Sequence, residues 1–111
     1  GGVLAKKIIL DEIKGSDFIN RGYEEKKELL EALCNWPDPD TEELIIGFFK
    51  KRGFFKRSRY QELNALAAHC LGILGTDRAL EVLRKNRNNK NPLVQENIVK
   101  AIKRIEDARK G

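Results

Sequence analysis

The fold is decided by residues 59–85, whose sequence is RYQELNALAAHCLGILGTDRALEVLRK. In its first part, apolar residues recur at the spacing expected for one face of an α-helix. These positions are Leu63, Leu66, Ala67, Cys70, Leu71 and Leu74. The small residues Ala65, Ala68 and Gly72 allow a neighbouring helix to approach closely. The pattern predicts a buried helix that is packed tightly against others.

Residues at the two ends of this helix predict a turn into a second helix. Ser58, with Gln61 three positions later, is typical of a helix start, because both side chains can bond free backbone groups. Gly75 stands where helices often end in a left-handed conformation, and Thr76 can cap the next helix. The apolar face of that helix would be Ala79, Leu80, Val82 and Leu83. We therefore expect an antiparallel helix pair, too short to bury its apolar face alone.

Similar patterns precede and follow this pair. A shift of 31 residues places a second apolar set in the same register: Val94, Ile98, Val99, Ala101, Ile102 and Ile105. Asn91 and Pro92 predict the start of that helix. A shift back by 38 residues gives a looser match in a helix expected from Glu24 to Trp36, with Trp36 in the core. A partner helix follows, with Asp40 and Glu43 as its start signal. Periods of this length indicate a helical repeat protein.

Residues 62–83, ELNALAAHCLGILGTDRALEVL, and residues 91–102, NPLVQENIVKAI, resemble the HEAT-type repeats of bacterial proteins. The similarity covers residues 59–105 well and residues 23–51 more weakly. It departs from the family pattern at Gln95 and in the linkers Gly15–Gly22 and Gly53–Ser58. The resemblance implies an all-α fold, an α-solenoid of about three stacked antiparallel helix pairs, partial at both ends. It implies no catalytic motif, because such repeats serve many functions.

Length and composition are those of a single domain, here expected to be HEAT-like over residues 1–111. The sequence contains no methionine, so we expect it to be a piece of a longer protein. No apolar run is long enough for a membrane span, and no signal peptide is recognisable, so we expect no membrane partner and a cytoplasmic location. Cys34 and Cys70 are expected to be buried thiols in a reducing compartment. The ends of a repeat stack could also mediate self-association.

The sequence offers little catalytic chemistry. His69 is the only histidine, and its neighbour Cys70 points about 100° away around the helix axis. Two separated cysteines and one histidine do not form a tetrahedral metal site. We therefore expect no enzymatic activity, no cofactor and no metal.

The strongest functional signal is the segment FFKKRGFFKRSRY, residues 48–60. It contains six cations and no acidic residue, interleaved with four phenylalanines. One interpretation is that the phenylalanines anchor a linker and the cations are merely solvated. The other is a surface for an anionic partner, which could be an acidic protein segment, nucleic acid or lipid head groups. The candidate binding residues are Lys50, Lys51, Arg52, Phe54, Phe55, Lys56, Arg57, Arg59 and Tyr60.

These observations favour a non-catalytic scaffold that binds another protein. Stacked helix pairs present an extended surface, on which a few aromatic or arginine side chains supply most of the affinity. Nucleic-acid binding is the alternative, since the net charge of +5 would permit weak, salt-sensitive association. Acidic residues are scattered along the same helices, however, and no base-reading motif is recognisable.

Overall fold

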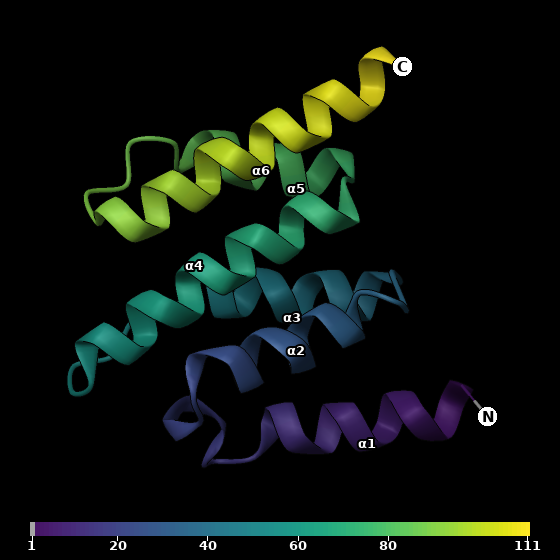
Figure 1. Ribbon diagram of the computed structural model, residues 1–111, viewed down its shortest axis with the longest axis vertical. Helices are drawn as coiled ribbons and strands as arrows, with labels where there is room; N and C mark the ends of the chain where they lie inside the picture. The colour runs from purple at the N-terminus through teal and green to yellow at the C-terminus, as the bar shows by residue number, and fades with distance from the viewer. Residues whose placement is uncertain (1) are drawn as a thin grey trace.

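A computed structural model describes residues 2–111 and shows an all-helical chain (Figure 1), which confirms the all-α part of the predicted fold. Its elements are α1 (Gly2–Lys14), a 3-10 turn η1 (Phe18–Asn20), α2 (Tyr23–Leu33), α3 (Pro39–Lys50), α4 (Arg57–Leu74), α5 (Asp77–Lys85) and α6 (Pro92–Lys110). No strand occurs within residues 2–111. Over the same residues, none of the helices has the length and apolar character that crossing a membrane would require.

Side-chain caps start three of the helices. Asn91 accepts a hydrogen bond from the backbone N–H of Val94, and Thr76 accepts one from that of Ala79, as their positions predicted. Asp38 caps α3 in the same way. Gly75 ends α4 with a positive φ of 64°, which a glycine adopts without steric conflict.

Three predicted helix boundaries are wrong. Helix α3 begins at Pro39, capped by Asp38, rather than at the predicted start signal formed by Asp40 and Glu43. The start of α4 is Arg57 rather than the capping box at Ser58; Lys56 precedes it in a left-handed conformation and makes no side-chain cap. Helix α2 ends at Leu33, so Trp36 lies in the turn and is only half-buried rather than in the core. The residue before a proline is disfavoured in helical conformation, and Pro37 therefore keeps Trp36 out of the helix.

Helix α4 occupies the centre of the molecule. It packs against α2 on one side and α6 on the other, and against α3 and α5 across the remaining surface (Figure 1). Three of its alanines, Ala65, Ala67 and Ala68, are fully buried. A Cβ atom added to Gly72 would lie 2.9 Å from the Cβ atom of Ala101 in α6. The small residues on α4 therefore allow α6 to approach closely, as the sequence suggested.

Apolar side chains remain exposed at both ends of the helix arrangement. In α6, five of the six predicted apolar positions are buried, but Val99 is 46% exposed. Val99 corresponds in register to Ala68 of α4. The helices next to α4 cover Ala68, but among residues 2–111 no further helix lies on the outer side of α6. Val99 is therefore an apolar position of the repeat register that does not belong to the core. In α1, the exposed apolar residues are Val3, Leu4 and Ile8.

Replacing Leu71 with alanine tests the position of the core. Its side chain is completely buried in α4. We expect Leu71→Ala to lower the free energy of unfolding by about 2–5 kcal/mol, because it removes buried methyl groups and leaves a cavity. Chemical denaturation followed by circular dichroism would measure the change. The half-exposed Val99→Ala is the control and should change stability by less than about 0.5 kcal/mol; equal effects would contradict this packing.

Candidate functional site

The segment that we call the basic loop, residues 50–60, comprises the last residue of α3, the connection 51–56 and the first turn of α4. Its position is set by Asn64, which is almost fully buried in α4. The side-chain amide of Asn64 donates to the backbone oxygen atoms of Phe48 at 2.8 Å and Lys51 at 2.9 Å. Because the last carbonyl groups of a helix have no partner within it, Asn64 joins the end of α3 firmly to α4.

Tyr60 and Gly53 fold the loop back on itself. A Cβ atom at Gly53 would overlap the ring of Tyr60 and would lie 2.8 Å from the backbone oxygen of Phe55. On the same ring, the Nζ atom of Lys51 lies 5.9 Å from the centroid, within the range of a cation–π contact. Glycine at position 53 therefore allows the close contact that gives the loop its shape.

The four phenylalanines have two different roles. Phe49 is buried and Phe48 is half-buried, its ring centroid 5.9 Å from that of Phe18. Phe54 and Phe55, in contrast, are 93% and 78% exposed. Their rings lie edge to face with centroids 5.2 Å apart. Phe48 and Phe49 are thus structural anchors, whereas Phe54 and Phe55 form an exposed aromatic pair.

Some of the cations hold the loop in place. Lys56 donates from Nζ to the side-chain oxygen of Asn20 at 2.7 Å. Arg59 donates to the backbone oxygen atoms of Asn20 at 3.0 Å and Arg21 at 3.4 Å. Lys56 and Arg59 therefore tie the start of α4 to η1. Lys50, at the end of α3, is exposed.

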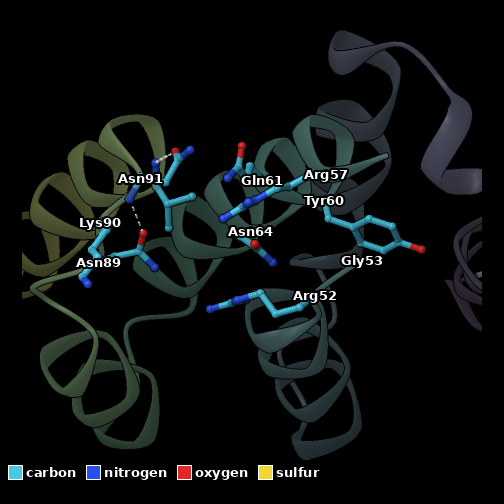
Figure 2. A pocket seen from close by; sticks show the side chains of 10 residues that line it. Arg52, Gly53, Arg57, Tyr60, Gln61, Asn64, Asn89, Lys90 and Asn91 are labelled. Atoms are coloured by element: carbon cyan, nitrogen blue, oxygen red, sulfur yellow. Dashed lines mark hydrogen bonds between the residues drawn. The ribbon is translucent and has the colours of Figure 1, made fainter. Parts of the chain in front are cut away.

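Two other cations line a pocket of about 360 Å³, which we call the cationic pocket (Figure 2). Arg52 and Arg57 extend toward the loop between α5 and α6, while the Tyr60 ring points the opposite way. That second loop contributes Lys90 to the lining. The full lining is Arg52, Gly53, Arg57, Tyr60, Gln61, Asn64, Asn89, Lys90, Asn91 and Val94.

The cationic pocket is positively charged without compensation. No carboxylate belongs to its lining, and Arg57 and Lys90 have no acidic partner within 4.0 Å among residues 2–111. One nitrogen of Arg52, Nη1, donates to the backbone oxygens of Phe49 and Lys51, both at 3.2 Å. Arg78 and Arg84, by comparison, are each paired with a glutamate. The arrangement suits an anionic ligand.

The contribution of Asn89, Lys90 and Asn91 to the cationic pocket was not predicted from the sequence. These residues lie about 30 positions from the basic loop, and their composition indicated only a turn. The spacing of the sequence repeats could have indicated that these residues lie near the basic loop. The shift of 31 residues that relates α4 to α6 also relates position 60 to position 91, so the starts of the two helices are neighbours.

His69 and the two cysteines lie elsewhere and are engaged in other contacts. The Nε2 atom of His69 lies 2.8 Å from a carboxylate oxygen of Glu31, which joins α4 to α2.

The thiol of Cys34 lies 4.0 Å from the backbone oxygen of Cys70. A hydrogen bond between the two thiols lowers the pKa of Cys34, and the same bond together with burial raises that of Cys70. Within residues 2–111, no cluster of His, Cys, Asp or Glu has the composition of a metal site.

Comparison with protein-family models, with curated proteins and with solved structures found no match to this chain. The resemblance to HEAT-type repeats therefore stays a prediction. The site has to be interpreted from its own geometry: an exposed aromatic pair on a loop whose two flanking arginines line a cationic pocket.

The contact between Gly53 and Tyr60 can be tested by substitution. We expect Gly53→Ala to displace the Tyr60 ring and to lower the midpoint of thermal unfolding, because the added methyl group overlaps the ring. Gly47→Ala is the matched control. Gly47 lies in α3 with open space around it, and alanine there should stabilise the helix by about 1 kcal/mol. The proposed packing would be contradicted if Gly53→Ala left both the nuclear magnetic resonance spectrum of the loop and the midpoint of thermal unfolding unchanged.

Proposed function

We propose that this protein is a non-catalytic helical scaffold that binds an acidic segment of another protein through the basic loop and the cationic pocket. The observation that carries the proposal is the exposure of Phe54 and Phe55 between Arg52 and Arg57. Aromatic and arginine side chains are the residues that most often dominate binding energy at protein interfaces. The pocket supplies the charge that an acidic segment would neutralise.

A repeat architecture is part of this proposal. Helices α2, α4 and α6 would be the first helices of successive repeats, and α3 and α5 the second helices. The contacts of α4 with both α2 and α6, and of α3 with α5, support such a stack. The caps at Asp38 and Thr76, which start the two second helices α3 and α5, support it as well. In an α-solenoid of this kind, loops at one edge of the stack form a continuous surface.

The energy of the aromatic pair is consistent with a binding role. Removing a phenylalanine side chain from water is worth about 1.5–3 kcal/mol, and here two such side chains are almost entirely in water. Within the protein, Phe54 and Phe55 are not buried and so do not contribute this energy to stability. A partner that covered Phe54 and Phe55 would gain it, while the arginines on either side would orient acidic groups.

Self-association is a secondary part of the proposal. Val3, Leu4 and Ile8 leave an apolar face on α1, and Leu93 and Val99 leave a smaller one on α6. Exposed faces at the ends of a helical stack favour contacts with further helices.

Selection of peptides from a random displayed library would test the proposal directly. We expect enrichment of peptides that combine Asp or Glu with an apolar residue. The double variant Phe54→Ser, Phe55→Ser should bind the selected peptides at least about tenfold more weakly, because each interface anchor is worth about 2 kcal/mol or more. Val3→Ser with Leu4→Ser, which changes another exposed apolar pair, on α1, is the control. Equal binding by both double variants would refute the proposed site.

Nucleic-acid binding is the second candidate, favoured by the uncompensated charge of Arg52, Arg57 and Lys90. It can be separated from the first by titration with random duplex and single-stranded oligonucleotides at two salt concentrations. Binding that weakens steeply with added salt and does not depend on Phe54 or Phe55 would favour this candidate. Absence of binding at low salt would eliminate it.

A further inference from the structure

The cationic pocket combines three segments that are distant in sequence. Arg52 comes from the end of the α3–α4 loop next to α3, Arg57 is the first residue of α4, and Lys90 lies in the α5–α6 loop. The guanidinium groups of Arg52 and Arg57 therefore extend toward one cavity from two different segments, and Lys90 borders it from a third (Figure 2). The volume of about 360 Å³ is at the low end of the range for small-ligand sites.

Hydrogen bonds hold two walls of the pocket. Arg52 is held by the carbonyl groups of Phe49 and Lys51, which leaves its Nε and Nη2 atoms available. The loop that carries Lys90 is held by Asn89, whose side chain accepts a bond of 2.9 Å from the backbone N–H of Asn91. The side chain of Asn91 in turn accepts from the N–H of Val94 at 3.1 Å (Figure 2). Arg52 and the backbone of the α5–α6 loop are thus held in place by contacts within the protein.

The start of α4 adds to the positive potential. Lys56, at the cap position, makes no side-chain cap, so the first turn of this 18-residue helix keeps its partial positive charge. The side chain of Gln61, one turn further along α4, lines the pocket and carries an amide group with two N–H donors.

We propose that the cationic pocket binds a phosphomonoester group, such as that of a phosphorylated serine, presented by the partner segment. This inference rests on the proposed function and specifies its ligand. A carboxylate carries one charge and two oxygen atoms, whereas a phosphomonoester carries nearly two charges and three strong acceptor oxygens. Two guanidinium groups and the side-chain amide of Gln61 match the second set better. The pocket is large enough for the phosphate and the side chain that bears it.

The convergence of the charges favours a phosphorylated protein over nucleic acid. A nucleic-acid backbone presents single charges at regular intervals, and proteins meet it with a row of cations along a surface. In the basic loop, however, Lys56 and Arg59 are bonded to Asn20 and Arg21 instead of extending such a row. The exposed pair Phe54 and Phe55 lies between the two pocket arginines in the chain and would contact apolar residues beside the phosphate.

Nuclear magnetic resonance titration of the whole protein with N-acetyl-phosphoserine amide tests the proposal. We expect saturable shifts of the side-chain amide signals of Gln61, Asn89 and Asn91. N-acetyl-serine amide should cause none, and N-acetyl-glutamate amide should bind at least about tenfold more weakly, since it offers fewer charge-assisted hydrogen bonds. If phosphoserine causes no saturable shift, or if glutamate binds equally well, the proposal is wrong.

Charge-removing variants locate the binding. We expect Arg52→Gln and Arg57→Gln each to weaken phosphoserine binding by about tenfold or more, because each removes charge-assisted bonds. Arg104→Gln is the matched control: this arginine is exposed on α6 and does not line the pocket. The affinity of this variant for phosphoserine should stay within about twofold of the unchanged protein. An equal loss in Arg104→Gln would indicate unspecific attraction and overturn the assignment.

Two further results separate this inference from the proposed function. If a single-stranded oligonucleotide shifts the same amide signals at lower concentration than phosphoserine, nucleic acid is the ligand and the proposal is overturned. If phosphoserine binds but the selected peptides bind equally well to the Phe54→Ser, Phe55→Ser variant, the pocket assignment is supported and the proposed aromatic interface fails. If peptides require the two phenylalanines but phosphoserine does not bind, only the phosphate assignment fails.

Discussion

The close approach of α4 and α6 at Gly72 and Ala101 is the constraint on which the rest of the structure depends. There is no room between these helices for a larger side chain, because a Cβ atom at Gly72 would already lie 3.0 Å from the backbone Cα atom of Ala101. The fully buried alanines of α4 continue the same narrow interface. Protein interiors are packed like organic crystals, so close-fitting small residues define one spacing between helices and exclude others. Helix α4 thereby becomes the element against which four other helices are positioned.

The same spacing creates the cationic pocket. The α5–α6 loop leads directly into α6, so the distance between α4 and α6 determines how far Lys90 lies from Arg57. The opposite wall depends on Asn64, whose buried amide bonds to the last carbonyl groups of α3 and so places Arg52. A buried amide that lost these bonds would carry a large desolvation penalty. Core packing and one buried polar side chain therefore position the functional groups, although none of these core residues would touch a ligand.

Helix ends that depend on nearby residues could be predicted from the sequence. The loop shape and the pocket lining, which depend on contacts between distant residues, could not. Gly75, Thr76 and Asn91 were assigned correctly, because each acts on backbone groups within four residues. The helix start at Ser58 was wrong, because a capping signal competes with the loop geometry set by Gly53 and Tyr60. Periodicity could have separated the phenylalanines: Phe49 continues the apolar face of Ile45 and Ile46, whereas Phe54 and Phe55 belong to no helix. Lys90 could not be assigned to the site from composition, since only the repeat register places it near Arg57.

The pattern of ion pairs explains why a modest net charge can be concentrated in one place. Three arginines outside the pocket are paired with acids on other helices: Arg78 with Glu43, Arg84 with Glu106 and Arg109 with Asp77. Exposed pairs of this kind contribute little to stability, so their main consequence is electrostatic. They neutralise positive charge over α3, α5 and α6, while the lining of the cationic pocket contains no acid. The unpaired charges of Arg52 and Arg57 therefore lie where two helix starts meet, and they would attract an anion toward the exposed aromatic pair beside them.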